Sequence, residues 1–140
     1  MSSFSKLAKH LERLAEEAEE HASEVAVEVA LAMVHQLAYS TPVDTSEALS
    51  NWQIGFAPVK AAIPAHAEGE KGSTKSVSAR ETVMRAQRVL SGRVAGQTIY
   101  VGNAAPHIYA LEYENASPQN QFFAEAANAY GLRLARELTQ

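Results

Sequence analysis

Apolar side chains recur every three or four positions along the first part of the chain. Such spacing places them on one face of an α-helix. The stripe consists of Leu7, Leu11, Leu14, Ala18, Ala22, Val25, Val29 and Met33. Ser3 or Ser5 can cap the start of this helix, and Pro42 ends it by disfavouring helical backbone at Thr41. We therefore predict a helix of about 35 residues, a rod of roughly 50 Å at ~1.5 Å per residue.

The two halves of this predicted helix differ in character. Up to Glu20 the stripe is narrow and flanked by glutamates, whereas from Val25 onward further apolar residues widen it. The rod is longer than a small domain is wide, so we expect residues 1–24 to project. The candidate subunit interface in this part consists of Leu7, Leu11 and Leu14. A narrow stripe suits a seam between helices, and plain exposure to solvent is the alternative.

The following segment predicts a helical turn and a strand. Asp44 and Glu47 have the spacing of a capping box, which favours a helical turn over residues 46–50. Apolar and polar or small residues then alternate up to Pro58, as in a strand with one buried face. The apolar members of this alternation are Trp52, Ile54 and Phe56.

The middle of the chain predicts a loop and a second helix. Residues 64–78 are rich in Gly, Ser, Lys and Ala and have almost no apolar anchor, which predicts a mobile loop. Ser78 and Glu81 form a second capping box. We expect it to open a helix that ends near Gly92.

The last third of the chain completes an α+β pattern. Residues 98–102 predict a short strand, with a turn at Gly102-Asn103. A short segment over 107–113 precedes Ser117-Pro118, which we expect to start the last helix. Its predicted buried stripe is Phe123, Ala127, Tyr130, Leu134 and Leu138. The expected fold is a single α+β domain over residues 1–140. In it, long N-terminal and C-terminal helices pack on a small, mostly antiparallel sheet, with one shorter middle helix.

Composition narrows the classes of function. The chain has 140 residues, no cysteine and a formal net charge of −4. Disulfides and thiolate metal sites are therefore excluded, and the net charge argues against a chain that mainly wraps nucleic acid. The apolar run from Val25 to Ala38 is too short for a bilayer, and acidic residues stand where a signal peptide would be apolar. We expect a soluble, intracellularly made protein.

The sequence carries no constellation that favours catalysis or metal binding. His66, Glu68, His107 and Glu112 have no recognised ligand spacing. A triad of Ser46, His107 and Asp44 could be drawn, but the chain has no Gly-x-Ser-x-Gly motif. Phosphate-binding and dinucleotide-binding glycine patterns are also missing. We expect neither an enzyme nor a cofactor.

Basic residues gather in the middle of this acidic chain. The candidates for contact with DNA or a partner are Lys71, Lys75, Arg85 and Arg88. They can meet a phosphate backbone or an acidic neighbour, and the alternative is a solvated loop and helix face. No aromatic residue lies between Phe56 and Tyr100, so no stacking platform for single strands is encoded there.

Residues 39–55 form a distinctive corner. Pro42 ends a helix, Asp44 caps the next turn, and Thr45 lies between it and the strand that begins at Trp52. A tryptophan ring at such a junction buries ~200 Å². A structural corner is a sufficient physical explanation for these four residues.

The chain also resembles the neck or tail-completion proteins of long-tailed, lambda-like bacteriophages. The resemblance lies in "TPVDTSEALSNWQIG" and "QTIYVGNAAPHIYALEYENAS" and spans about residues 25–130. The matching residues are Thr41, Pro42, Val43, Asp44, Thr45, Asn51, Trp52, Ile99, Tyr100, Asn103, Pro106, Leu111 and Glu112. Ser46 and Glu114 stand where the family usually has glycine, and Pro118-Gln119-Asn120 replaces a usual Gln-Ala-Pro. The loop before the last helix is therefore expected to differ in shape.

This resemblance implies a non-enzymatic virion protein at the junction of capsid and tail. It implies a ring of copies, expected to be six-fold, between head-completion or connector proteins and the tail terminator, with DNA in the channel. The expected location is the virion neck, and the host cytoplasm during assembly. The alternative is a small nucleic-acid-binding or regulatory module that uses the basic segment 71–93.

Overall fold

The computed structural model describes residues 3–41, 47–64, 75–106, 108–114 and 122–139. The elements are α1 (Ser3–Ser40), α2 (Glu47–Ser50), β1 (Trp52–Gly55), α3 (Lys75–Ser91), β2 (Tyr100–Asn103), α4 (Ile108–Tyr113) and α5 (Phe123–Leu138). Long terminal helices, shorter middle helices and a two-stranded antiparallel sheet confirm the α+β fold class.

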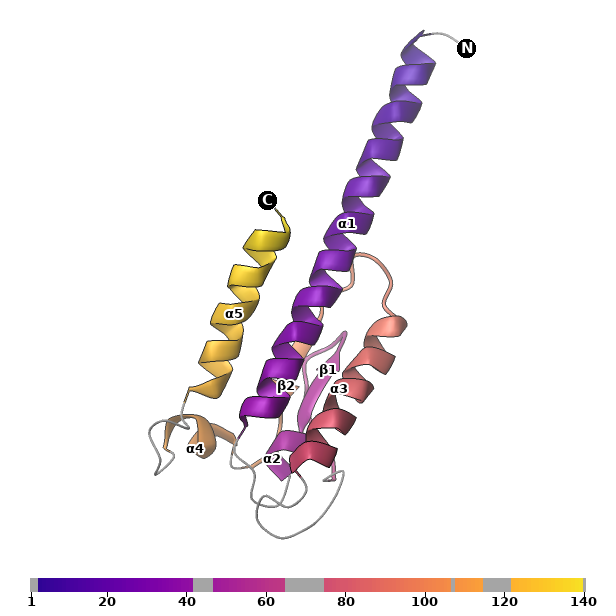
Figure 1. Cartoon of the computed structure of the whole chain (residues 1–140). Helices are drawn as coiled ribbons and strands as arrows, with labels where there is room; N and C mark the ends of the chain where they lie inside the picture. The colour runs from indigo at the N-terminus through magenta and orange to yellow at the C-terminus, as the bar shows by residue number, and fades with distance from the viewer. Residues whose placement is uncertain (1–2, 42–46, 65–74, 107, 115–121, 140) are drawn as a thin grey trace.

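The C-terminal half of α1 is the centre of the domain. Helices α5 and α3 flank it, and both run in the direction opposite to α1 (Figure 1). Three apolar clusters lie along this half of α1. Val34 packs with residues of β1 and α3, Leu37 packs with Trp52 and Phe123, and Ala38 packs with α2 and the start of α3. The widening of the apolar stripe after Val25 reflects this packing on several sides.

The sheet consists of one strand pair whose register places Trp52 opposite Asn103 and Gly55 opposite Tyr100. Burial alternates along β1, in agreement with the sequence pattern. The predicted turn at Gly102-Asn103 is wrong, because both residues lie within β2. A Cβ atom at Gly102 would lie 3.0 Å from the Val59 side chain, so the glycine serves close approach to another segment.

Helix α3 begins at Lys75, so the predicted loop and the cap at Ser78 are wrong over residues 75–78. Ser78 is fully buried inside the helix, and among the described residues its hydroxyl has no hydrogen-bond partner. The buried face of α3 is built largely from small side chains, namely Ser78, Ala79, Thr82 and Ala86. A search for large apolar anchors overlooks such a face. The rest of the predicted loop, residues 65–74, lies outside the described residues.

Helix α5 begins at Phe123, five residues later than Ser117-Pro118 predicts. Its N-cap residue Phe122 has a left-handed backbone (φ 60°) and no capping side chain of its own. The carboxylate of buried Glu112 accepts hydrogen bonds from the backbone N–H groups of Ala124 at 2.8 Å and Glu125 at 3.2 Å. The Glu112 carboxylate on α4 therefore caps α5, and no local sequence motif indicates this contact.

Candidate functional site

The structure places Trp52, the tryptophan of the predicted corner, in the interior. Its indole Nε1 donates to Thr41 Oγ1 at 2.7 Å, and Thr41 in turn donates to the Leu37 carbonyl. The ring meets Phe123 edge-on, with 6.3 Å between centroids. Trp52 thus connects β1, the end of α1 and the start of α5. Pro42, Asp44 and Thr45 lie outside the described residues.

Two asparagines of the family-like motifs are also structural. Asn51 is fully buried and bonds the backbone of Ile63 twice, through Nδ2 at 3.0 Å and Oδ1 at 2.7 Å. Asn103 Nδ2 donates to the Ala48 carbonyl at 2.7 Å. With Glu112 capping α5, these side chains hold loops and helix ends. The described motif residues are thus dispersed through the fold and do not converge on one pocket.

The guanidinium of Arg85 bonds backbone groups within the domain. Its Nη2 donates to the carbonyls of Ser50 and Trp52, both at 2.8 Å. Burial lowers the pKa of Arg85, Arg88 lowers it further, and Glu81 opposes them. We therefore correct the sequence-based assignment of Arg85 to a DNA or partner contact: this guanidinium holds the α2–β1 segment against α3.

The remaining basic candidates differ from Arg85. Lys75 and Arg88 are exposed on α3, as is Arg80. They occur together with exposed apolar residues, Val77 and Met84, on the same helix. Lys71 lies outside the described residues. Arg80, Met84 and Arg88 recur at every fourth position and so form one exposed, basic and partly apolar face of α3, and Lys75 lies at the start of the helix.

The N-terminal part of α1 stands free of the domain (Figure 1). His21 Nε2 donates to the carbonyl of Leu138, near the end of α5, at 3.3 Å, and Arg93 Nη1 donates to Ser23 Oγ at 2.6 Å. Leu138, at the end of α5, and Arg93, just after α3, therefore contact α1 at about the same level. Every described side chain before this level is exposed. We call residues 4–20 the arm.

The candidate interface leucines lie on this arm. Leu7, Leu11 and Leu14 are 52%, 55% and 48% exposed, and Phe4 is 85% exposed. A row of large apolar side chains on a free helix is unusual for a chain that stays alone, because such patches mark interaction surfaces. Nothing else in the described structure covers this row.

An apolar groove continues the arm into the domain. It has a volume of about 560 Å³ and lies between α1, the segment before β2, and α5. Ala22, Val25 and Val29 line its α1 wall, and Ile99 and Ala135 line the other sides. Among the described residues, Arg93 is the one charged residue in its lining. The groove therefore suits apolar contact rather than acid–base chemistry.

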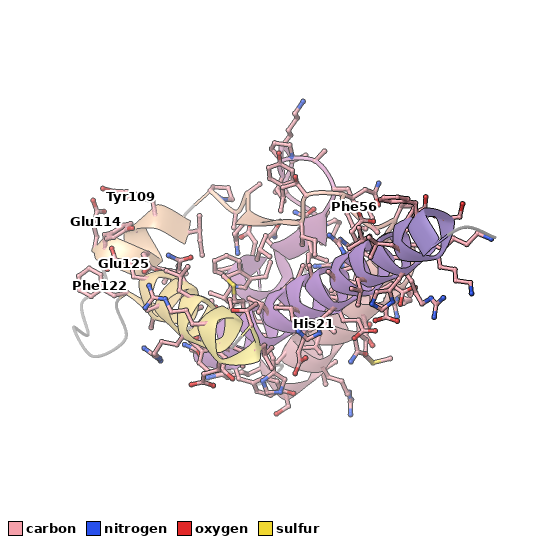
Figure 2. The ribbon with its side chains drawn as sticks, turned by 90° about the horizontal axis from the view of Figure 1, so that it is seen from above. His21, Phe56, Tyr109, Glu114, Phe122 and Glu125 are labelled. Carbon is pink, nitrogen blue, oxygen red and sulfur yellow. The ribbon has the colours of Figure 1, made fainter. Side chains whose placement is uncertain are left out.

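Sequence reasoning missed an exposed aromatic patch formed by Tyr109, Tyr113 and Phe122. Successive ring centroids lie 4.8 Å and 5.9 Å apart, and Tyr109 is 66% exposed. Figure 2 shows Tyr109 and Phe122 with Glu114 and Glu125 at the outer edge of the molecule, away from α1. Desolvation, and then the Glu125 carboxylate, raise the pKa of the Tyr113 hydroxyl. The i, i+4 spacing of the tyrosines was the available signal.

The described residues offer little for other classes of function. Among them, no three His, Asp or Glu side chains come together in a way that could hold a metal ion. The members of the drawn triad, Ser46, His107 and Asp44, lie outside the described part of the chain, as do His66 and Glu68. No described helix combines the length and apolar character needed to cross a bilayer.

Comparison with known proteins adds no relative to this picture: no family model matches the chain, and neither the curated proteins nor the solved structures contain a significant match.

Proposed function

We propose that this chain is a structural protein of the neck of a tailed phage, where copies assemble as a ring between the capsid connector and the tail. The observation that carries the proposal is the presence of two different exposed surfaces on the two sides of α1: basic residues on α3, and the aromatic patch beside carboxylates on the α4–α5 side. The sequence resemblance supplies the identity of the assembly. The expected ring is six-fold, surrounds the DNA channel, and contacts head-completion or connector proteins and the tail terminator.

The two sides of the molecule support a ring. A closed ring needs two different, complementary surfaces on each subunit. The α4–α5 edge presents the aromatic patch with Glu114 and Glu125, and α3, on the other side of α1, presents Lys75, Arg80 and Arg88. Exposed aromatics beside carboxylates suit cationic side chains. The acidic, aromatic edge of one copy therefore fits the basic face of the next.

The roles of the motif residues agree with a structural protein. Trp52, Asn51 and Glu112 each hold separate segments together, as the hydrogen bonds above describe. A catalytic motif would instead bring its side chains to one reacting centre. The protein acts in this proposal by shape and by contact, and requires no cofactor. It would reside in the virion neck, after assembly in the host cytoplasm.

A second candidate is a nucleic-acid-binding or regulatory module. The exposed basic residues of α3 favour it. Arg85 no longer contributes to this surface, because its guanidinium bonds two backbone carbonyls. The remaining charge is modest for a protein that relies on phosphate contacts.

The deciding experiment is a mass measurement of the purified protein, alone and mixed with candidate head-completion and tail-terminator proteins. We expect a closed oligomer, and a larger complex when the neck proteins are added. A chain that stays monomeric in every mixture, yet binds duplex DNA in a salt-dependent way, would refute the neck assignment in favour of the second candidate.

A further inference from the structure

The exposed stripe of the arm has the period of a coiled coil. From Phe4 onward, the steps between seam positions alternate between three and four residues, which is the a/d pattern of a heptad. The seam positions are Phe4, Leu7, Leu11, Leu14, Ala18, His21 and Val25. All of them up to His21 are exposed in the described structure. About three heptads are the length at which such a pattern indicates a coiled coil.

The side chains along one flank of this seam are small. Ala8, Ala15 and Ala22 recur at every seventh position, each directly after a d residue in the sequence. Alanine at these positions lets a second helix approach closely, because interaxial distance follows the size of the side chains at the contact. The helix that covers this seam can therefore lie near the backbone of α1.

The charges of the arm are separated along its length. The basic residues Lys6, Lys9 and Arg13 lie in its first half, which has one acidic residue, Glu12. The second half carries only acidic charges, namely Glu16, Glu17, Glu19 and Glu20. A parallel pair of arms would align like charges, which is unfavourable, whereas an antiparallel pair aligns opposite charges.

We propose that the arm pairs with the arm of a second copy of this chain as an antiparallel two-helix coiled coil. The heptad positions restrict the register, and full overlap of the two arms selects one. Leu11 lies opposite Leu14 of the second copy, Leu7 opposite its Ala18, and Phe4 opposite its His21. Each layer joins an a residue with a d residue, as antiparallel packing requires, and the large leucines occupy the two central layers.

The apolar groove lies where the end of this coiled coil would contact the domain. In the proposed register, Phe4 of the second copy reaches the level of His21, where α5 ends. The apolar groove begins there with Ala22 and Val25, which continue the same stripe. The most exposed large side chain of the arm thus arrives at this apolar groove.

The pairing is independent of the neck proposal. Two arms related by a two-fold axis bury the same surface on both copies. Such a contact joins subunits in pairs, whereas ring closure uses the different surfaces of the α3 and α4–α5 sides. A protein of another function would pair its arms in the same way.

The test uses the absence of cysteine from the chain. Two single-cysteine variants of the full chain, Ala8→Cys and Ala15→Cys, are given different mass tags, mixed and oxidised gently. Antiparallel arms place position 8 beside position 15 of the other copy, within the reach of a disulfide. We expect the mixed 8–15 disulfide to exceed both like-with-like disulfides by roughly tenfold. At ~1.5 Å per residue, the 8–15 partners are offset by about 3 Å along the axis, whereas the 15–15 and 8–8 partners are offset by about 8 Å and about 14 Å.

The matched control is Lys9→Cys with Glu16→Cys, a pair with the same spacing on the outer face of the helix. This pair should give little disulfide of any kind. Predominant 8–8 and 15–15 products, or yields equal to the control, would refute antiparallel pairing. A ring that assembles without the 8–15 product would overturn this inference and leave the neck proposal intact. If the 8–15 product forms but the protein binds none of the neck partners, the neck proposal is refuted and the pairing of the arms stands.

Discussion

At the scale of single residues, the distinctive side chains of this protein act as connectors. Trp52 reaches from the sheet to both long helices, Arg85 ties α3 to the α2–β1 segment, and Glu112 caps a helix on another element. Each satisfies polar groups that the fold takes out of water. Removing such a group costs more than the net value of one hydrogen bond, because its partner remains buried and unpaired.

Trp52→Ala should lower the free energy of unfolding by about 3–5 kcal/mol, since it empties a large buried site. Denaturant unfolding followed by circular dichroism measures this loss. Trp52→Phe is the matched variant: it keeps an aromatic ring but leaves Thr41 without its indole donor, so the loss should be smaller. Full stability of the alanine variant combined with failed assembly would place Trp52 at an interface instead.

Glu112→Ala should destabilise the protein by about 1–3 kcal/mol, because the first N–H groups of α5 lose their acceptor. Amide hydrogen exchange of Ala124 and Glu125 should accelerate, whereas exchange in α3 should change little. Glu114→Ala is the control, because this neighbouring carboxylate is exposed. If both variants leave the exchange of α5 unchanged, the carboxylate does not stabilise the helix end.

At the scale of elements, α1 consists of a buried half and an exposed half within one continuous helix. The change occurs at His21 and Ser23, which bond Leu138 at the end of α5 and Arg93 just after α3. Beyond that level the helix has no tertiary support within the described chain. Most helical stability in proteins comes from packing of an apolar face, so we expect the arm to gain order when that face is covered.

Changing both Leu11 and Leu14 to Glu should abolish association through the arm while the domain still folds. The two side chains are about half exposed, so the free energy of unfolding of the domain should change by less than about 0.5 kcal/mol. Light scattering at several concentrations reports the mass, and thermal unfolding reports the fold. A double variant that assembles like the parent would show that the leucines take no part in assembly.

Lys75→Glu combined with Arg88→Glu should weaken binding through α3 without unfolding the domain. Both side chains are exposed, so the effect acts through charge and should decline as salt is added. Ring formation and DNA retention are the readouts. The control is Arg133→Glu with Arg136→Glu, an exposed basic pair on α5. Equal losses in both double variants would indicate a general charge effect instead of a specific surface.

At the scale of the whole molecule, the described residues present three surfaces for partners: the arm, the basic face of α3 and the aromatic patch. They lie on different sides of one compact arrangement around α1 (Figures 1 and 2). A protein that pairs through one surface and forms rings through two others can build an extended assembly from a single fold. This combination supports the proposed role in a virion.

Tyr109→Ala should reduce ring formation but leave the subunit stable, because Tyr109 is 66% exposed and contributes little to the core. Aromatic side chains commonly dominate interfaces. Native mass spectrometry separates rings from subunits, and Tyr100→Ala, which changes an exposed tyrosine outside the patch, is the control. If rings form at the same concentration in the parent and the Tyr109 variant, the patch does not contribute to ring closure.

The sequence alone predicted the long N-terminal helix, the short helix after it and the half-buried strand at Trp52. These features follow from the spacing of apolar residues along a continuous segment, and from the prolines and caps at its ends. The exposed leucines of the arm were identifiable for the same reason. The length of an apolar stripe can be determined from the sequence alone, and a stripe longer than a small domain is wide indicates a projecting helix. The sequence placed the projecting part at residues 1–24, whereas His21 and Ser23 already bond other parts of the domain.

Only the tertiary structure decided the start of α3, the cap of α5, the role of Arg85 and the aromatic patch. Each depends on residues distant in sequence: small side chains that fit against α1, a carboxylate from α4, carbonyls from α2 and β1, and rings from two helices. Serine, glycine and asparagine favour turns and caps in isolation. In this fold Ser78, Gly102 and Asn103 are small or polar because neighbouring segments approach them closely, and that physical demand exists only once the chain is folded.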